Sequence, residues 1–244
     1  MRALLIDAGN SRVKWGFWST GRLQDSGVIS TAAFRDGKAA LPSVEPTRVL
    51  VSNVAGEQVA RRLIDSPVAP EFVNAMAECG GVINAYSAPE RLGVDRWMAL
   101  LAARAEFDQA CLVVDAGTAV TLDALAADGQ HIGGQILPGA PLMMASLASG
   151  TSDLPDLETE AGIAPASAEL FATATDDAIR RGSWTAVIGA VDVACRSLRD
   201  REGDVRLVLT GGDAPRMLNA MAMPVEHRPD LVLHGLAVML ESTA

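Results

Sequence analysis

The stretch Leu4-Leu5-Ile6-Asp7-Ala8-Gly9-Asn10-Ser11 recurs in altered form as Leu112-Val113-Val114-Asp115-Ala116-Gly117-Thr118. Each copy is an apolar run that ends in Asp-Ala-Gly and continues with hydroxyl or amide residues. A second run with the character of a β-strand follows each copy, at 13–18 and at 119–122. We therefore expect two related halves that divide near residue 110, each opening with strand, tight turn and strand.

The rest of the chain mixes strands and helices in both halves. Further strands are expected at 3–6, 48–54, 132–137 and 206–209. Helical spacing predicts helices at 57–64, 93–107, 167–181, 184–199 and 231–240, and one after Pro138-Gly139. This mixture predicts a two-domain α/β architecture, with residues 1–110 in one domain and 111–244 in the other.

Composition restricts the classes of partner. The 244 residues are 49% hydrophobic and 20% charged, as in an ordinary globular protein, and the formal net charge is −10. No Lys/Arg-rich run could follow a nucleic-acid backbone, so nucleic acid is not expected as a partner. No charged leader precedes the first strand, and the longest apolar run, 231–240, is too short to span a bilayer. We expect a soluble cytoplasmic protein without a membrane partner.

Cysteine and histidine show no spacing typical of a metal site or a disulfide framework. The cysteines are expected to be buried small apolar residues, and the histidines to be structural or surface residues. These residues are Cys79, Cys111, Cys195, His131, His227 and His234.

The two Asp-Ala-Gly turns are candidate phosphate loops. A Walker loop is absent, because Gly37-Lys38 lacks both the upstream glycine and the following hydroxyl. Gly9 and Gly117 permit a tight bend that points backbone amides outward as a concave anion site. One such turn reflects only the preference of Asp and Gly for turns, whereas two copies at matching places indicate function.

Polar side chains flank both turns. Asp7 and Asp115 each stand where a buried strand emerges, a position from which a carboxylate can hold a metal ion or its water shell. The hydroxyls of Ser11 and Thr118 can donate to phosphate, and Lys14 adds a positive charge. The pattern predicts a site for a polyphosphate and a cation.

These turns resemble the motifs of a known superfamily. Residues 7–11 with Lys14 and Gly16, residues 115–118, and Thr210-Gly211-Gly212 are similar to the phosphate 1, phosphate 2 and adenosine motifs of the acetate kinase, sugar kinase, Hsp70 and actin superfamily. The resemblance implies an α/β fold of two ribonuclease-H-like domains that close on ATP, with the active site in the cleft between them.

Further segments resemble one family, the type III pantothenate kinases. Tyr86 and the run Leu92-Gly93-Val94-Asp95-Arg96 are similar to its signature of a tyrosine followed by Gly-x-Asp-Arg. Residues 133–139 resemble its Gly-Gly-x-Ile-x-Pro-Gly, and residues 174–182 its Asn-Thr-x-x-Ala-Ile-x-x-Gly, with Ala174 in place of the usual Asn. The resemblance implies transfer of the ATP γ-phosphate to the primary hydroxyl of pantothenate, the first step of coenzyme A synthesis.

The same resemblance implies a role for each matched residue. Asp95 would be the general base, Asp7 would hold Mg²⁺ through water, and Asp115 would bind a monovalent cation, K⁺ or NH₄⁺. The residues implied in ATP binding are Asp7, Ala8, Gly9, Asn10, Ser11, Arg12, Val13, Lys14 and Thr118. Those implied in pantothenate binding are Tyr86, Gly93, Val94, Asp95, Arg96 and Thr175.

Physical chemistry leaves alternatives for the substrate motif. Arg96 at a helix start can pair with a carboxylate while Asp95 accepts a hydroxyl hydrogen bond. The alternative is that Asp95 only caps the helix and that Arg96 is solvated. Tyr86, the only tyrosine, is either a pocket wall or a half-buried packing residue.

The family resemblance also implies a homodimer with shared active sites, in which Thr175 of one chain reaches the pantothenate pocket of the other. Two other functions compete with this interpretation. One is a different small-molecule kinase of the same superfamily, such as a sugar kinase, and the other is a non-enzymatic regulator. The joint presence of Asp7, Asp95, Asp115 and Lys14 favours a catalyst, because a pure binding module has no need of all four.

Overall fold

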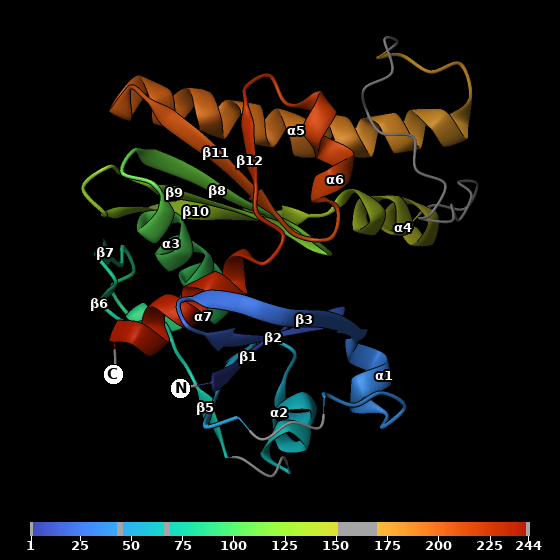
Figure 1. Cartoon of the computed structure of the whole chain (residues 1–244). Helices are drawn as coiled ribbons and strands as arrows, with labels where there is room; N and C mark the ends of the chain where they lie inside the picture. Colours follow the sequence, from blue (N-terminus) through green and yellow to red (C-terminus); the bar gives the residue numbers. More distant parts are fainter. Residues whose placement is uncertain (1, 43–45, 66–68, 151–169, 243–244) are drawn as a thin grey trace. The chain divides into compact units, whose positions relative to one another are not determined.

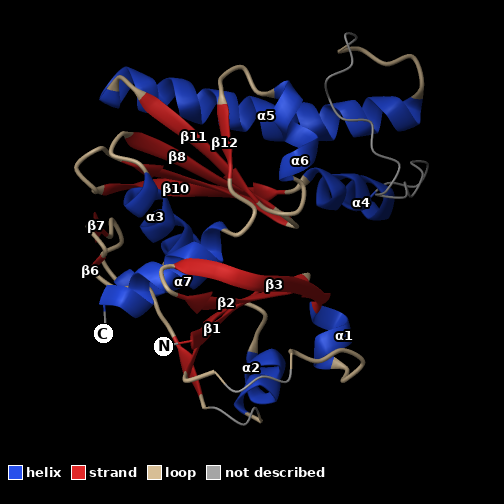
Figure 2. Cartoon of the chain, in the orientation of Figure 1, coloured by secondary structure: helices blue, strands red, loops and turns tan. Residues whose placement is uncertain are grey.

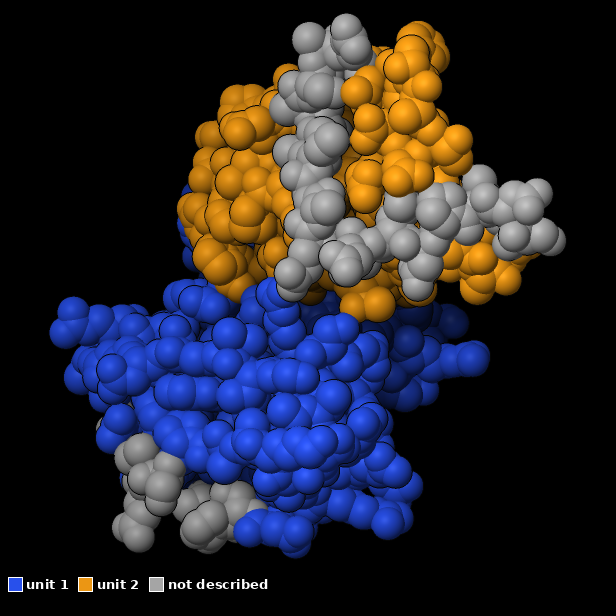
Figure 3. All heavy atoms as spheres, turned by 90° about the vertical axis from the view of Figure 1, so that its right-hand side faces the viewer, with its two compact units in different colours: residues 1–108, 129–131, 230–244 blue, residues 109–128, 132–229 orange. Residues whose placement is uncertain are grey.

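The computed structural model describes residues 2–42, 46–65, 69–150 and 170–242, and these form two compact units. Unit 1 comprises Met1–Asp108, Gly129–His131 and Asp230–Ala244, and unit 2 comprises Gln109–Asp128 and Ile132–Pro229 (Figure 3). The chain therefore passes between the units four times. The secondary structure of both is drawn in Figure 2.

Unit 1 is built on a five-stranded mixed sheet in the order β3-β2-β1-β4-β5 (Figure 1). β1 pairs antiparallel with β2 and parallel with β4, so it is the central strand. A separate short hairpin joins β6 and β7. The strands are β1 (Arg2–Ala8), β2 (Arg12–Ser19), β3 (Arg22–Ser30), β4 (Arg48–Asn53), β5 (Pro70–Phe72), β6 (Glu78–Cys79) and β7 (Val82–Ile83).

Helices cover both faces of this sheet. In Figure 1, α1 and α2 lie on one face and α7 on the other, and α7 contacts β1, β2 and β4. α3 packs along α7 and also contacts β4. The helices are α1 (Thr31–Arg35), α2 (Glu57–Ile64), the 3-10 turn η1 (Pro89–Arg91), α3 (Val94–Glu106) and α7 (Leu231–Ser242).

Side-chain alternation along β1 determines which face Asp7 occupies. Leu4, Ile6 and Ala8 are buried in the core that includes Phe34 of α1 and Leu63 of α2. Because successive side chains of a strand point to opposite faces, Asp7 lies on the other face, the one that α7 covers. The carboxylate of the first Asp-Ala-Gly turn is thus directed away from α1 and α2.

The C-terminal helix returns to unit 1. Gly235 of α7 lies so close to α3 that a β-carbon there would collide with the carbonyl oxygen of Met98. This close packing explains why 230–244 clusters with unit 1, whereas the sequence predicted a single cut near residue 110. Contacts between helices far apart in the chain decide the division, and local periodicity does not report them.

Unit 2 repeats the architecture of unit 1. Its sheet has the order β10-β9-β8-β11-β12, with β8 antiparallel to β9 and parallel to β11, which matches the first sheet strand for strand. The expected duplication is therefore present in the topology. The elements are β8 (Ala110–Ala116), β9 (Ala119–Leu125), β10 (His131–Pro138), α4 (Ala140–Gly150), α5 (Thr175–Glu202), β11 (Val205–Thr210), α6 (Ala214–Met217), η2 (Leu218–Ala220) and β12 (Val225–His227).

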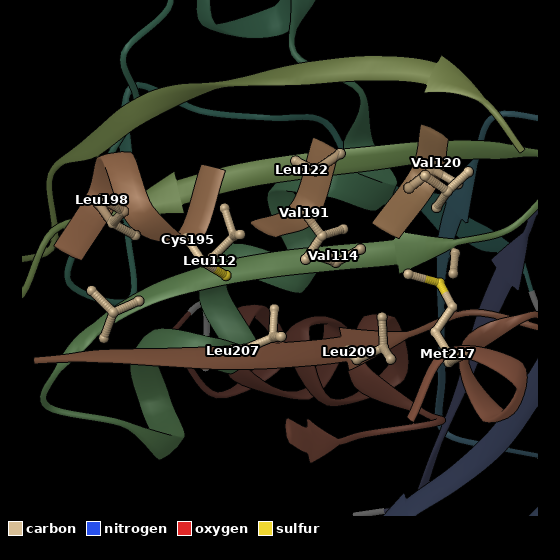
Figure 4. Packing of buried hydrophobic residues seen from close by; sticks show 14 of the residues in the cluster. Leu112, Val114, Val120, Leu122, Val191, Cys195, Leu198, Leu207, Leu209 and Met217 are labelled. Carbon is tan, nitrogen blue, oxygen red and sulfur yellow. The ribbon is translucent and has the colours of Figure 1, made fainter. Parts of the chain in front are cut away.

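The core of unit 2 lies between its sheet and α5. Leu112 and Val114 of β8 and Leu207 of β11 pack against Val191 and Cys195 of α5 (Figure 4). Burial raises the pKa of the Cys195 thiol to about 11. The thiol therefore behaves as a small apolar group, as expected from the sequence. Cys111 is buried as well, whereas Cys79 is only half-buried.

Two sequence expectations need correction. Residues 175–202 form one continuous helix rather than two, because Gly182-Ser183 does not break it and the Ser183 hydroxyl donates a hydrogen bond to the Ile179 carbonyl inside the helix. The predicted start of the first of these helices, 167–169, lies outside the described residues, and 170–174 are not helical.

Within the described residues, no helix is long and apolar enough to cross a bilayer.

Candidate active site

The first candidate phosphate loop is a tight connection between β1 and β2. The Gly9 amide donates to the Arg12 carbonyl at 3.0 Å, and Thr31 of α1 holds the loop from outside. The Thr31 hydroxyl donates to the Gly9 carbonyl at 2.7 Å, and its amide donates to the Ser11 carbonyl at 3.0 Å. Thr31 is buried, and no local pattern in the sequence indicates its role, because that role depends on a contact 22 residues away.

The predicted ATP-binding residues divide into two groups. The side chains of Ala8 and Val13 are buried in the core, so only their backbone can contact a ligand. Asn10, Ser11 and Arg12 are exposed on the turn. This division follows from alternation, since strand ends bury every second side chain while the turn exposes consecutive ones.

Three polar side chains share one face of the unit 1 sheet. Asp7 pairs with Lys14 across the antiparallel strands and with Ser52 across the parallel ones, so all three lie on the same face. Ser52 is fully buried, and its hydroxyl has no hydrogen-bond partner among the described residues. Asp7 and Lys14 were predicted from the sequence, whereas Ser52 stands inside an ordinary strand pattern that gives no signal for it.

The predicted substrate motif forms the N-terminus of α3. Gly93 is the N-cap residue, with extended ψ and no Cβ, and a β-carbon there would lie 2.7 Å from Asp95 Oδ1. The same Oδ1 accepts a hydrogen bond from the Arg96 amide at 2.8 Å. Asp95 therefore folds back over the first turn of the helix, and the glycine makes room for it.

Arg96 is buried, so the alternative of a solvated arginine is wrong. Its side chain is 7% exposed, and Nη1 donates to the Tyr86 hydroxyl at 3.1 Å. Tyr86 is half-buried, and the guanidinium carbon of Arg96 lies 5.9 Å from the centre of its ring. A buried guanidinium needs polar partners, which makes this site suited to an anionic group.

Asn84 organises the loop that carries Tyr86. Its Oδ1 accepts from the Tyr86 amide at 3.0 Å, while its Nδ2 donates to the carbonyls of Met76 at 3.1 Å and Pro89 at 3.3 Å. This one amide therefore joins the segment before the β6–β7 hairpin to the 3-10 turn before α3. The sequence shows only an isolated Asn, so no signal could have identified it.

In unit 2, two further glycine segments converge on the second candidate phosphate loop. The Gly139 amide donates to the Thr118 carbonyl, and the Asp213 amide to the Ala116 carbonyl, both at 2.9 Å. A β-carbon on Gly139 would collide with the Gly117 carbonyl. One on Gly211 would collide with the Ala116 carbonyl and with Asp115 Oδ1. The phosphate 2, adenosine and Pro-Gly segments predicted from the sequence are thus neighbours in space.

The remaining predicted residues lie on the surface of unit 2 or in its strands. Asp115 is half-buried at the end of β8, and Thr118 is exposed on the turn. Thr175 is the first residue of α5 and is exposed.

Among the described residues, no group of three His, Cys, Asp or Glu side chains could hold a metal ion. Single carboxylates remain suited to Mg²⁺, which usually keeps several waters and binds one or two carboxylates together with substrate phosphates.

The fold has a counterpart among solved structures. A solved structure from Sinorhizobium meliloti, described as a 2-dehydro-3-deoxygalactonokinase, is 18% identical with a TM-score of 0.64, and the match covers 99% of each chain. Together with the duplicated strand order, this likeness shows a two-domain α/β fold of the acetate and sugar kinase, Hsp70 and actin type.

The family model of the type III pantothenate kinases matches residues 3–197. A type III pantothenate kinase from Nitrosococcus oceani is 38% identical, with 99% of this chain and 94% of that protein covered. One from Burkholderia vietnamiensis is 42% identical, with 97% and 95% covered. The chain belongs to the type III pantothenate kinase family. It is an ATP-dependent kinase that phosphorylates pantothenate in coenzyme A biosynthesis. The alternative of a sugar kinase, which the sequence left open, is therefore excluded.

Replacement of Gly211 by Ala is expected to weaken ATP binding selectively. The added β-carbon would push against Asp115 and Ala116, and φ at Gly211 is +98°. We expect the KM for ATP to rise roughly tenfold or more, with a smaller effect on the KM for pantothenate. Gly203→Ala is the matched control, because Gly203 also has a positive φ of +84° but open space around it. Equal effects of both variants on the ATP KM would contradict the interpretation.

Proposed function

We propose that Asp95 and Arg96 at the N-terminus of α3 form the pantothenate site, and that Asp95 orients the primary hydroxyl for attack on the γ-phosphate. The observation that supports this most directly is that the Arg96 guanidinium is buried and held by Tyr86, while the Arg96 backbone amide holds the Asp95 carboxylate. A guanidinium kept out of water and next to helix N-terminal amides is matched to the carboxylate of pantothenate.

Asp95 has the geometry of a positioned base. Its Oδ1 accepts from the Arg96 amide, which holds the carboxylate plane in one orientation relative to the helix. Phosphoryl transfer passes through a loose transition state, so the carboxylate has to align the hydroxyl and accept its proton late. The substrate hydroxyl oxygen forms a bond to the γ-phosphorus while the bond between the γ-phosphorus and its bridging oxygen breaks; the hydroxyl proton moves to Asp95 and ADP leaves. The capping role and the catalytic role are therefore compatible.

ATP binding is assigned to the two Asp-Ala-Gly loops. The backbone of residues 8–13, the Lys14 ammonium and the Thr118 hydroxyl would contact the nucleotide, and Asp7 would hold Mg²⁺ through its water shell. Lys14 stands opposite Asp7 in the sheet register, which supports a shared task in neutralising the phosphates. When bound, Mg²⁺ supplies charge neutralisation of the triphosphate.

A monovalent cation, K⁺ or NH₄⁺, is assigned to Asp115. The carboxylate stands at a turn with the backbone carbonyls of Ala116, Gly117 and Thr118 nearby in sequence, and oxygen ligands of this kind suit such a cation. A protein of net charge −10 needs local cations where it binds a triphosphate.

We further propose that the enzyme acts in the cytoplasm, where ATP is available.

The proposal includes a homodimer in which Thr175 contributes to the partner's pantothenate pocket. Large apolar side chains are exposed on and beside the helices of unit 2: Leu142 and Leu147 of α4, Val193 of α5, and Phe171, which is 85% exposed just before α5. Apolar surface of this kind is typical of protein interfaces. Thr175 begins the same helix and is exposed, as a residue that reaches a neighbouring chain must be.

Asp95→Asn is expected to retain the fold but to lower kcat with pantothenate by roughly a hundredfold or more, because the amide cannot accept the proton. Coupled measurement of ADP release gives the rate. Asp108→Asn makes the same charge change at an exposed position beyond the other end of α3 and should leave kcat within about twofold. Turnover of Asp95→Asn close to that of the control would remove Asp95 from the mechanism.

Activity is expected to depend on the monovalent cation. At constant ionic strength, replacing K⁺ or NH₄⁺ by Na⁺ or tetramethylammonium should lower kcat/KM for ATP, because the larger site no longer holds an ion of matching size. Asp115→Asn should lower the response to K⁺ itself. Indifference of the native enzyme to the cation would refute the Asp115 assignment.

Shared active sites have a signature in mixed dimers. Asp95→Asn disables chemistry and Thr175→Phe obstructs the pocket, so each homodimer should be nearly inactive. Co-expression should restore about a quarter of native activity, because half of randomly paired dimers are hybrids and each hybrid holds one intact site. If hybrids are confirmed by native mass spectrometry without recovery of activity, Thr175 does not act in the partner's pocket.

A further inference from the structure

His131 is a buried histidine next to the proposed pantothenate site. It is 0% exposed, and its ring stacks on that of Tyr86 with 6.1 Å between the centroids and 10° between the planes. Tyr86 in turn accepts the hydrogen bond from Arg96 Nη1. Side chains 45 residues apart in sequence thus form one continuous series: imidazole, phenol and guanidinium.

The backbone before His131 is attached to the β6–β7 hairpin, which also precedes Tyr86 in the chain. The Ile83 amide donates to the Gly129 carbonyl at 3.0 Å, and Gln130 Nε2 donates to the carbonyls of Ile83 at 3.3 Å and His131 at 2.8 Å. A β-carbon on Gly129 would collide with the Gly81 carbonyl, so this close approach requires glycine. His131 is therefore held relative to the β6–β7 hairpin.

Tyr86 is attached to that hairpin from the other side. It follows Ile83 by three residues, and the side chain of Asn84 anchors its amide. Hydrogen bonds therefore fix the backbone of both Tyr86 and His131 at the β6–β7 hairpin, and the stacked side chains connect the two residues a second time. The imidazole lies parallel to the Tyr86 ring and so offers a flat surface against which that ring can rest.

We propose that His131 is a positioning residue for pantothenate: its stacked ring holds Tyr86 in the orientation that directs the Arg96 guanidinium toward the substrate carboxylate. The inference rests on the proposed site at Arg96. His131 touches neither substrate nor ATP in this role and acts only through Tyr86. Its contribution comes from ring shape and stacking, so an aromatic ring without nitrogen should serve as well.

The test compares three substitutions by steady-state kinetics. His131→Ala and His131→Gln remove the ring and should raise the KM for pantothenate roughly three- to tenfold, the range of one aromatic pair, while kcat and the KM for ATP stay within about twofold. His131→Phe keeps a ring and should restore the KM for pantothenate. A purely structural role would instead lower stability or the active fraction, and would not select one substrate.

His234→Ala is the matched control. His234 also makes an aromatic contact in unit 1, with its ring 5.9 Å from that of Trp18 at 87°, but it is exposed on α7. Its removal should leave both KM values unchanged. A rise in the pantothenate KM equal to that of His131→Ala would overturn the proposal, because it would show a general effect of losing a histidine.

A double-mutant cycle remains decisive if His131→Phe is too large for its buried position. In a Tyr86→Ala background, His131→Ala should have no further effect on the pantothenate KM, because the residue through which it acts is gone. Additive effects would overturn the proposal. An unchanged pantothenate KM in Arg96→Lys would instead show that the proposed site itself is misplaced. A raised KM in Arg96→Lys with no effect of His131→Ala would refute the role of His131 alone.

Discussion

The alternation of side chains along a central strand is the constraint on which the rest of the structure depends. In β1, Leu4, Ile6 and Ala8 enter the core shared with α1 and α2, so Asp7 must face the other way. In β8, Leu112, Val114 and Ala116 enter the core beneath α5, and Asp115 takes the corresponding place. A shift of one residue would bury each carboxylate in its apolar core, so the register that stabilises the sheet also positions the candidate ligands.

The two units share one sheet topology but differ in the loops that this sheet carries. Both sheets have the same strand order, and both central strands end in an Asp-Ala-Gly turn. Unit 1 adds the loop from Asn84 to Arg96 and the helix α3, which carry the groups suited to a small anionic substrate. Unit 2 instead brings Gly139 and Gly211 against its turn, where only glycine leaves room for such close backbone packing. The duplicated strands provide a common frame, and the two units differ in the loops that join these strands.

An enzyme with net charge −10 that acts on ATP and pantothenate has to concentrate its cations. The buried Arg96 is suited to this task, because a guanidinium held by Tyr86 and shielded from water interacts more strongly with a carboxylate than an exposed one does. Lys14 lies opposite Asp7 on the same sheet face, next to the first Asp-Ala-Gly turn.

The sequence by itself determined the duplication, most strands and helices, the superfamily and the family, because these depend on local periodicity and on contiguous motifs. It also identified Asp7, Asp95, Asp115 and the glycine turns as candidates. Only the tertiary structure decided that Arg96 is buried, that Asn84 and Thr31 anchor the loops, that α7 packs on α3, and that His131 stacks on Tyr86. Three of these depend on segments that meet across 22 or more residues, Asn84 acts through one amide that joins several backbone groups, and Arg96 is held by Tyr86, 10 residues earlier. Such contacts follow from how apolar faces pack together, and no single stretch of sequence encodes them.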